Sequence, residues 1–373
     1  MNMGQTDTQA LIESGHKQAL AKITRRIHEV GAHYLHATHD GRYNLKTPHS
    51  WTSGFWPGLV RLALNEIDDE GARDAARRAE DGLFEMFQNP DFYQLHHDIG
   101  FQFLPTAVMR YRQTGDESAK LRGIVAANLL AGRFNPASGM IEAWNGDERR
   151  GYSIIDTLMN LPLLMWATDV TNEPRYANIA YAHIDRAMKD FVHDDTTTRH
   201  IVEYDQLTGD LVGTHGGQGY SATSAWSRGL SWAVYGMAIA ARYSRRTDYA
   251  VWSRKFADRF LELNAEHGVP PWDFRAPDVK TAPRDSSASA IVACGLLELD
   301  ALGIYSNARE QASDLVIALI NDAASFEDEQ DGLLLDGTSA LPKDIHVGDS
   351  LIYGDYYFFE ALQRLTGTTQ TCW

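Results

Sequence analysis

The sequence predicts an all-α fold in which six helical hairpins close into a ring. Two observations lead to this prediction. Amphipathic helical segments alternate along the chain with segments that are apolar on nearly every side. Connections into the apolar segments are long, whereas connections out of them are short. Because a helix that is apolar all round must be buried, we expect six inner helices surrounded by six outer ones, forming one domain over residues 1–373.

The predicted outer helices carry small apolar residues at helical spacing, with charged residues between them. Residues 70–89 show the pattern, since alanines recur there three and four positions apart between arginines and acids. Polar capping signals precede most of these segments. The predicted outer helices span about 8–37, 70–89, 114–130, 171–188, 246–263 and 305–320.

The predicted inner helices are apolar on most faces and carry Gly, Ser or Thr near their beginnings, which permits close packing. They span 54–64, 98–111, 154–167, 224–243, 285–302 and 350–362. An open helical solenoid would show the same alternation. It would not require acids and tryptophans where the buried helices begin, so we favour the closed ring.

The long connections all lead into inner helices, so they gather at one end of the ring. They cover about 38–51, 134–153, 192–221, 266–283 and 323–348. Long loops in a compact domain are usually functional. We therefore expect the active site at this end, with short β-hairpins in its loops around residues 139–144 and 200–213.

Composition excludes several classes of protein. The formal net charge is −16 and the pI about 5.3, which argues against nucleic acid or an anionic membrane as the main partner. The cysteines are only Cys294 and Cys372, too few for a disulfide framework or a metal cluster. The N-terminus lacks an apolar signal core, and no apolar run is long enough to span a membrane. We expect a cytoplasmic protein, monomeric or homodimeric.

Asp98 and Asp156 are the leading candidates for acid–base chemistry. Each is predicted at or near the beginning of an inner helix, at the long-loop end. Burial raises the pKa of a carboxyl group, whereas a helix N-terminus lowers it. Two acids in unequal surroundings can therefore divide the roles of acid and base. The alternative is that each is an ordinary N-cap. His96 and His97 next to Asp98 make a poor metal site, because adjacent helical residues do not share a face.

The stretch THGGQGYSATSAWSRGLSW, residues 214–232, combines a glycine-rich loop with the start of an inner helix. Arg228 and Trp232 lie four residues apart, on one helical face. Arginine can bind a carboxylate through two hydrogen bonds, and Trp232 or Trp51 can stack on a sugar. On spacing alone, the tryptophans can equally be core and Arg228 a structural ion-pair partner. His200 and Gln218 lie in loops and are polar surface or structural residues by default.

Six motifs follow one another along the chain. In chain order they are HHDIGF (96–101), IIDTLMNLPLL (154–164), Gln218 with SAWSRGLSWAVYG (224–236), WDF (272–274), RDSSASAIVACGLLE (284–298) and YGDYYFFEAL (353–362). Together they resemble the unsaturated glucuronyl hydrolases, glycoside hydrolase family 88. The resemblance runs from about residue 50 to residue 366. The unsaturated rhamnogalacturonyl hydrolases, a related group, fit less well.

The resemblance implies an (α/α)6 barrel and an activity. Family members remove the 4,5-unsaturated uronic acid at the non-reducing end of oligosaccharides that polysaccharide lyases release. They hydrate the C4=C5 vinyl ether, and the resulting hemiketal opens and expels the aglycone. The resemblance implies no metal and no organic cofactor. A glycosidase or sugar epimerase on the same barrel is the alternative, although an epimerase would be expected to use a histidine pair.

The resemblance also assigns roles by motif. Asp156 matches the proton donor to C4, which then activates the water that attacks C5, and Asp98 matches the second essential aspartate. The matching substrate-binding positions are Trp51, His200, Gln218, Arg228 and Trp232. Ser339 and Lys343, in a loop at the same end, are candidates to contact a sulfate on the next sugar; a solvated loop is the alternative. The parent polysaccharide can be a glycosaminoglycan, ulvan, gellan or xanthan.

Overall fold

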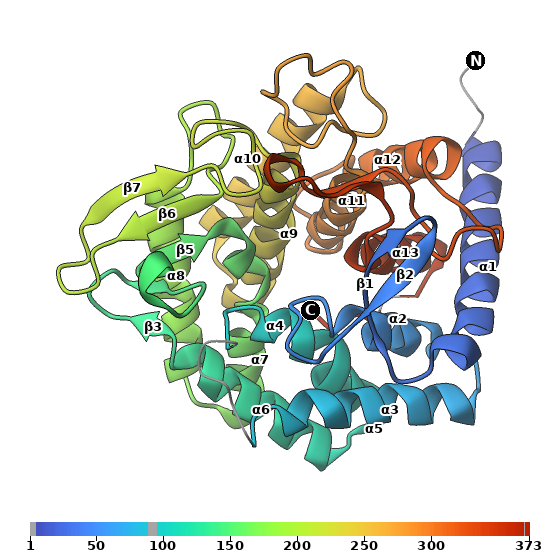
Figure 1. Ribbon diagram of the computed structural model, residues 1–373, viewed down its shortest axis with the longest axis horizontal. Coiled ribbons are helices and arrows are strands. Elements are labelled where there is room, and N and C mark those ends of the chain that lie inside the picture. Colours follow the sequence, from blue (N-terminus) through green and yellow to red (C-terminus); the bar gives the residue numbers. More distant parts are fainter. Residues whose placement is uncertain (1–4, 89–94, 369) are drawn as a thin grey trace.

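Twelve helices alternate between an inner and an outer ring. They are seen in a computed structural model that describes residues 5–88, 95–368 and 370–373 (Figure 1). The outer helices are α1 (Gln5–Val30), α3 (Glu70–Glu85), α6 (Glu117–Ala131), α8 (Arg175–Asp190), α10 (Thr247–Asn264) and α12 (Ala308–Asp322). The alternation predicted from the sequence is confirmed.

The inner helices are buried along nearly their whole length. They are α2 (Phe55–Ala63), α4 with α5 (Ile99–Phe103 and Met109–Thr114, joined by a π-helical turn, Leu104–Val108), α7 (Pro162–Thr171), α9 (Ser227–Ser244), α11 (Ser286–Ala301) and α13 (Ile352–Thr366). The π-helical turn contains Pro105, whose missing N–H and ring disturb the regular hydrogen-bond ladder.

Two outer helices, α3 and α6, begin at capping residues, and α3 packs through alanines. The side chain of Asp69 accepts the N–H of Ala72 at 2.9 Å and so caps α3. The Asp116 side chain caps α6 in the same way, through the N–H of Ser118 at 2.8 Å. The face of α3 turned toward the inner ring carries buried small and apolar residues, which are Ala72, Ala75, Ala76, Ala79 and Leu83.

The ring closes on itself. The last inner helix, α13, packs against both α1 and α2, and α1 also contacts α12. An open solenoid would leave its first and last repeats apart, so this closure excludes the solenoid alternative.

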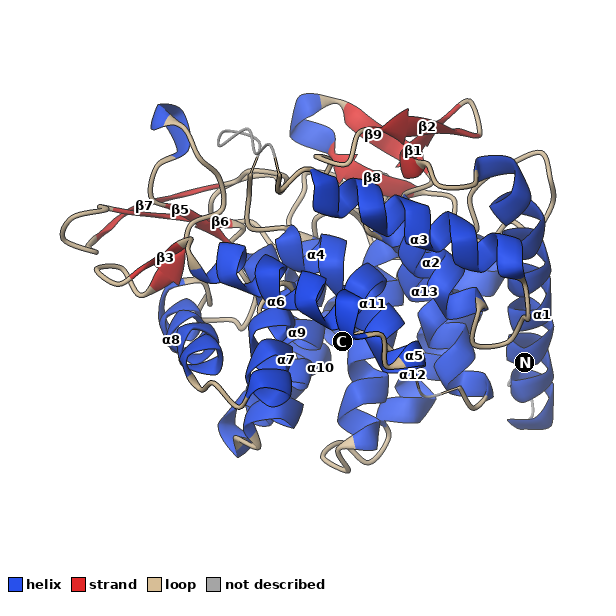
Figure 2. Cartoon of the chain, turned by 90° about the horizontal axis from the view of Figure 1, so that it is seen from below, coloured by secondary structure: helices blue, strands red, loops and turns tan. Residues whose placement is uncertain are grey.

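Four small antiparallel sheets lie in the loops toward one end of the helices (Figure 2). Their strands are β1 (Tyr34–His39) with β2 (Arg42–Lys46), β3 (Phe134–Asn135) with β4 (Met140–Ile141), β5 (Tyr152–Ile154) with β6 (Ile201–Tyr204) and β7 (Leu211–His215), and β8 (Gly337–Ala340) with β9 (Ile345–Asp349). Hairpins at the two predicted places are confirmed.

The predicted end of the first helix, near residue 37, is wrong. Helix α1 ends at Val30, and the following Gly31 has φ of +61°, a left-handed conformation that stops a helix. Residues 34–39 instead form β1, which turns back into β2 through Asp40 and Gly41, both with positive φ. Of the helices in the described part of the chain, none is long and apolar enough to cross a membrane.

Candidate active site

Asp98 lies at the N-cap position of α4, but its side chain makes no capping hydrogen bond. Its carboxylate is instead held by the two preceding histidines. The Oδ2 atom lies 3.0 Å from Nδ1 of His96, and Oδ1 lies 3.4 Å from Nε2 of His97. His96 in turn donates from Nε2 to the backbone oxygen of His49 at 3.1 Å. The capping alternative for Asp98 is therefore excluded.

Asp156 lies in a short 3₁₀ helix, Ile155–Met159, immediately before α7. The residue is 5% exposed, and it is not the N-cap of this helix, which is Ile154. Asn160, one turn later, ties this helix to α4, because its Oδ1 accepts the N–H of Phe101 at 2.8 Å. Only glycine fits at position 100, where a Cβ atom would lie 2.5 Å from the Cα of Asn160. Gly100 thus allows the segments that carry the two acids to pack together.

The two acids are also joined through their neighbours in sequence. Nδ1 of His97 lies 2.9 Å from Oγ1 of Thr157, and both side chains are buried. This bond fixes the segment that carries Asp98 against the segment that carries Asp156. Across the described residues, no three His, Cys, Asp or Glu side chains come together as a group able to hold a metal ion.

The surroundings of the two carboxyl groups shift their pKa values in opposite directions. Burial and the negative charge of Asp98 raise the pKa of Asp156 to about 7. Burial acts in the same direction on Asp98, but the adjacent His97 and His96 outweigh it and hold the pKa of Asp98 below its usual value. At neutral pH Asp98 is thus ionised, while a large fraction of Asp156 carries a proton.

His200 is held in one tautomer beside Asp156. Its Nδ1 accepts the backbone N–H of Gln218 at 2.8 Å, so the ring hydrogen is on Nε2, which lies 3.6 Å from Oδ2 of Asp156. Burial lowers the pKa of His200 to about 3, so the ring is neutral. Gly217 makes this contact possible, because it has φ of +61° and a Cβ atom there would lie 2.0 Å from Nδ1 of His200.

Strand pairing explains how His200 reaches Asp156 from a distant part of the sequence. The β5–β6 ladder pairs Ile154 with Ile201. It is extended by one more bond, from the N–H of Ile155 to the backbone oxygen of His200 at 3.1 Å. The residues that follow β5 and precede β6 therefore lie side by side.

Arg228 is buried at the beginning of α9 and is surrounded by acceptors. It forms an ion pair with Asp285, and it donates to the backbone oxygens of Thr338 and Ser339 at 2.7 and 2.6 Å. A fourth bond reaches Oε1 of Gln218 at 2.7 Å. Both terminal nitrogens are thus used by protein acceptors. The expectation that Arg228 offers its guanidinium to a substrate carboxylate is not met in this structure, and the ion-pair alternative describes it.

The expectation that Trp232 stacks on a sugar is wrong, because its side chain is 0% exposed. It packs against Phe101 and Tyr357, with ring centroids 5.2 and 5.6 Å apart. Helix α9, which carries Trp232, packs on the 3₁₀ helix that carries Asp156, and the indole N–H acts to lower the pKa of that carboxyl group. Trp232 therefore lies beneath the site.

Trp51 is half-buried, and its role in stacking on a sugar stays a prediction. Its ring contacts Tyr353, with centroids 4.8 Å apart, and it lies edge-on to His36.

Ser339, in β8, is buried, whereas Lys343, in the turn before β9, is exposed. Lys343 is close enough to His200 to act on the pKa of that ring. The β8–β9 hairpin thus borders the site.

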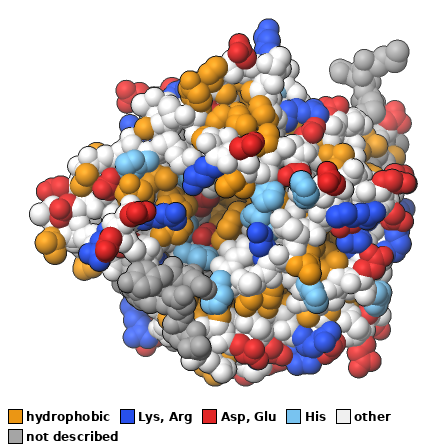
Figure 3. Space-filling view, in the orientation of Figure 1, with side chains coloured by type: hydrophobic (Ala, Val, Ile, Leu, Met, Phe, Trp, Pro, Cys, Tyr) orange, Lys and Arg blue, Asp and Glu red, His pale blue; other side chains and the backbone are white. Residues whose placement is uncertain are grey.

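The face seen in Figure 3 is hollowed near the centre of the ring. Histidine and basic side chains lie around the hollow, and acidic side chains are visible within it.

Sequence reasoning missed four residues near the site, namely Thr157, Asn160, Trp226 and Tyr353. A signal existed for Asn160, which lies four residues after Asp156 and so on the same helical face. Trp226 and Tyr353 sandwich Arg228, whose guanidinium carbon lies 4.7 and 5.3 Å from their ring centroids.

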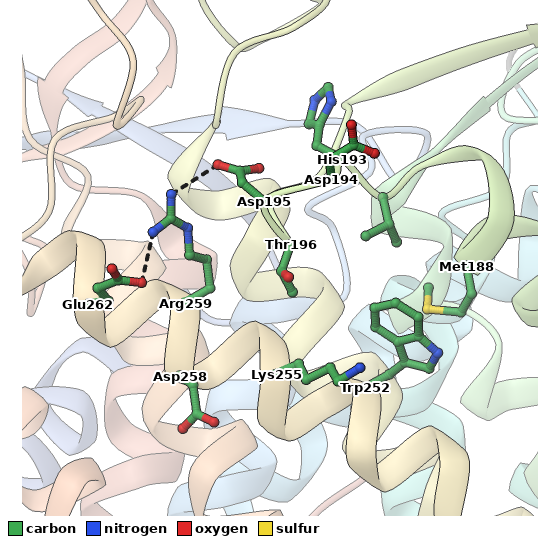
Figure 4. Close-up of a pocket in the computed structure, with 11 residues that line it drawn as sticks. Met188, His193, Asp194, Asp195, Thr196, Trp252, Lys255, Asp258, Arg259 and Glu262 are labelled. Carbon is green, nitrogen blue, oxygen red and sulfur yellow. Dashed lines mark hydrogen bonds and ion pairs between the residues drawn. The ribbon is translucent and has the colours of Figure 1, made fainter.

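A separate cleft of about 780 Å³ lies on the outside of the ring, between α10 and the segment that follows α8 (Figure 4). Some of its charged side chains pair with one another, since Arg259 pairs with Asp195 at 2.9 Å and with Glu262 at 2.7 Å. The predicted site residues do not line this cleft. We therefore place the candidate active site at the ring centre.

The arrangement at the ring centre suits transfer of a proton to a bound substrate. It holds a protonated carboxyl group, an ionised carboxylate and a neutral imidazole N–H in a buried setting. Comparisons with known proteins show to which family the chain belongs. The profile of Glycosyl Hydrolase Family 88 matches residues 23–359. The chain belongs to Glycosyl Hydrolase Family 88.

Individual members of Family 88 are similar over nearly the whole chain. The unsaturated glucuronyl hydrolase of Bacillus sp. strain GL1 is 37% identical over 93% of this chain and 94% of its own. A crystal structure of unsaturated glucuronyl hydrolase from Bacillus sp. GL1 superposes with a TM-score of 0.90 and 33% identity, over 95% and 97% of the two chains. A variant of the Streptococcus agalactiae enzyme, complexed with dGlcA-GalNAc6S, gives a TM-score of 0.84 and 26% identity, over 98% and 94%.

These comparisons confirm the resemblance and the (α/α)6 fold. They also show that the chain is a glycoside hydrolase. The Family 88 relatives carry the name of unsaturated glucuronyl hydrolases, so the rhamnogalacturonyl, glycosidase and epimerase alternatives are not favoured.

Proposed function

We propose that this chain removes the 4,5-unsaturated uronic acid from the non-reducing end of lyase-generated oligosaccharides by hydrating the C4=C5 vinyl ether. The observation that carries the proposal is the unequal protonation of two buried acids, with the pKa of Asp156 raised to about 7 and that of Asp98 lowered. Vinyl ether hydration needs a proton donor, and it needs a negative charge near the cation that forms.

The reaction begins with transfer of the Asp156 proton to C4, which leaves positive charge shared between C5 and the ring oxygen. Asp98, kept ionised by His96 and His97, stabilises that charge. Water then attacks C5 and gives a proton to the Asp156 carboxylate, which restores the donor. The C5 hemiketal opens to a ketone, and the hemiacetal left at C1 expels the aglycone as an alcohol.

The remaining side chains bind and position the sugar. Trp51 offers a half-buried ring for stacking. Gln218 holds His200 through its backbone N–H, while its side-chain Oε1 accepts a hydrogen bond from Arg228. We assign Arg228 a positioning role, because its terminal nitrogens hold Gln218 and the β8–β9 hairpin in place.

Short oligosaccharides suit this chain better than polymers do. A net charge of −16 slows the approach of a long polyanion.

Lys343 at the edge of the site supplies one local cation, and Ser339 one hydroxyl, for a sulfate on the second sugar. The Lys343→Ser variant is expected to raise KM several-fold for a sulfated disaccharide and to leave KM for its unsulfated form unchanged. Lys255→Ser, on the outer helix α10, is the matched control. Equal effects on both substrates would exclude this sulfate contact.

The activity is tested by following the ultraviolet absorbance of unsaturated chondroitin, heparin and ulvan disaccharides. We expect the absorbance of at least one to decay, and the decay to be lost in Asp156→Asn. Asp169→Asn, an exposed change on α7, is the matched control. No decay with any of the three, for well-folded protein, would contradict the substrate assignment, and a near-normal rate in Asp156→Asn would exclude it as the donor.

A further inference from the structure

Residues 370–373 enter the ring from the end opposite the candidate active site. Asn65, just after α2, donates to the backbone oxygen of Gln370 at 3.4 Å. Arg112 in α5 and Arg242 in α9 each donate to the main-chain oxygen of Trp373 at 2.6 Å. These anchors lie at the carboxyl ends of inner helices, whereas the site lies where the inner helices begin. Figure 1 accordingly shows the C-terminus inside the ring.

The side chain of Trp373 is part of the core. It is 0% exposed, and its indole N–H donates to Oε2 of Glu360 at 2.7 Å. The ring stacks on Tyr357, with centroids 5.6 Å apart and planes inclined by 20°. A buried tryptophan held by both a stacked ring and a hydrogen bond has one well-defined position.

Aromatic contacts connect Trp373 to the floor of the active site. Tyr357 meets the edge of Trp232, with centroids 5.6 Å apart. Phe101 lies beside this route, since its ring contacts Trp373 at 6.3 Å and Trp232 at 5.2 Å. Helix α9, which carries Trp232, packs closely on the 3₁₀ helix Ile155–Met159 that carries Asp156, since a Cβ atom at Gly236 would lie 2.7 Å from the Cβ of Leu158. An aromatic column thus runs through the barrel interior, from the far end to the candidate proton donor.

We propose that Trp373 is a positioning residue for Asp156, acting through Tyr357 and Trp232. Because protein interiors are close-packed, displacement of one ring in a column displaces the next. A shift of about 1 Å in a catalytic group can reduce the rate as much as 10²-fold. The inference rests on the proposed role of Asp156 as the proton donor.

The test compares Trp373→Ala with Trp373→Phe, and each with the same change at Trp56. Trp56 is a matched control, because it is also buried and donates one indole hydrogen bond, to the backbone oxygen of Gly31 at 3.1 Å, on the α1 side of α2. For each variant, kcat, KM, the pH profile of kcat/KM and Tm are measured on an unsaturated disaccharide that the native protein turns over.

We expect Trp373→Ala to lower kcat about tenfold or more while KM changes less than threefold. The basic limb of the pH profile, where kcat/KM declines at high pH, should move to higher pH in this variant. The reason is that a loosened Trp232 no longer lowers the pKa of Asp156. Trp373→Phe keeps a ring against Tyr357 and should retain kcat within about threefold. Added indole should restore part of the lost kcat, since an apolar cavity binds an apolar ligand of its own shape. Both Trp56 variants should lower Tm and leave the pH profile unchanged.

A Trp373→Ala variant that loses Tm but keeps the native kcat and pH profile would overturn the inference and leave Trp373 a structural residue only. If Trp373→Ala does not fold, Trp373→Leu replaces it, because leucine restores part of the volume without a flat ring. Its kcat and pH profile are then judged in the same way. An active Asp156→Asn variant would instead overturn the proposed function. An inactive Asp156→Asn, together with a Trp373→Ala variant that behaves like Trp56→Ala, would overturn only this inference.

Discussion

The Nε2 atom of His200 lies 3.6 Å from Oδ2 of Asp156, and the N–H of Gln218 on Nδ1 fixes the hydrogen of the ring on Nε2. The imidazole therefore directs a neutral N–H at the candidate proton donor. Because the pKa of His200 is lowered to about 3, this ring does not change its charge over the range in which the enzyme is expected to work.

The first prediction concerns His200→Gln. We expect kcat to fall about 10- to 100-fold, since a glutamine amide can replace one of the two ring contacts but not both in the same geometry. The residual activity should keep its basic limb, because Asp156 and not His200 titrates there. Loss of that limb in His200→Gln would show that His200 is the titrating group.

The second prediction concerns the pH profile of the native protein. The donor must be protonated, and its pKa is about 7, so kcat/KM should fall as the pH rises through about 7, tenfold per unit well above it. Asp98 must be ionised, and its pKa is lowered, so the acid limb should lie below about pH 4. A profile that rises between pH 7 and pH 9 would contradict this assignment of roles.

The Asp98→Asn variant tests whether the basic limb of the pH profile belongs to Asp156. The charge of Asp98 is one cause of the raised pKa of Asp156, so its removal should move the basic limb of the residual activity to lower pH. A limb that stays in place would mean that the two carboxyl groups do not interact.

The third prediction concerns stability. The pKa of Asp156 is raised from 3.8 to about 7 in the fold, so ionising it costs stability that accumulates as the pH rises between those values. At about 1.4 kcal/mol per unit, the cost reaches up to about 4 kcal/mol at pH 8. Asp156→Asn should therefore raise the free energy of unfolding at pH 8 and change it little at pH 4. Thermal denaturation at both pH values checks this, and equal changes at both would refute it.

The fourth prediction separates stability from positioning at Arg228. Arg228→Met leaves Asp285 buried without its cation, which should cost about 3–5 kcal/mol of unfolding free energy. The double variant Arg228→Met with Asp285→Leu should recover much of that stability, yet stay impaired in turnover because Gln218 and the β8–β9 hairpin lose their anchor. The free energy of unfolding in denaturant and kcat are measured on the native protein, on Arg228→Met and on the double variant. Full activity in the double variant would exclude a positioning role.

Much of this architecture could be predicted because it follows from local pattern. The alternation of amphipathic and apolar segments gave the order of the helices, and loop lengths placed the site at one end. The β1–β2 hairpin was missed although a signal was present, since Asp40 and Gly41 form an Asp-Gly turn typical of two-residue hairpins.

The site could be predicted only in part. Asp98 and Asp156 stood out because each was predicted at the long-loop end of an inner helix and because each matches a motif of the resembled family. The burial of Trp232 could not be foreseen, because helical spacing shows which residues share a face but not how deep that face lies. The hydrogen-bond partners of Arg228 come from three separate segments, which contain Gln218, Asp285 and Thr338. The route from Trp373 to Asp156 likewise depends on tertiary packing alone.

The most direct test of the central claim is turnover in deuterated water, with the product analysed by NMR. If Asp156 protonates C4, the released 4-deoxy sugar should carry one solvent deuterium at C4, and Asp156→Asn should form no labelled product. A product without deuterium at C4 would mean that the enzyme cleaves the glycosidic bond directly, and it would contradict the hydration mechanism.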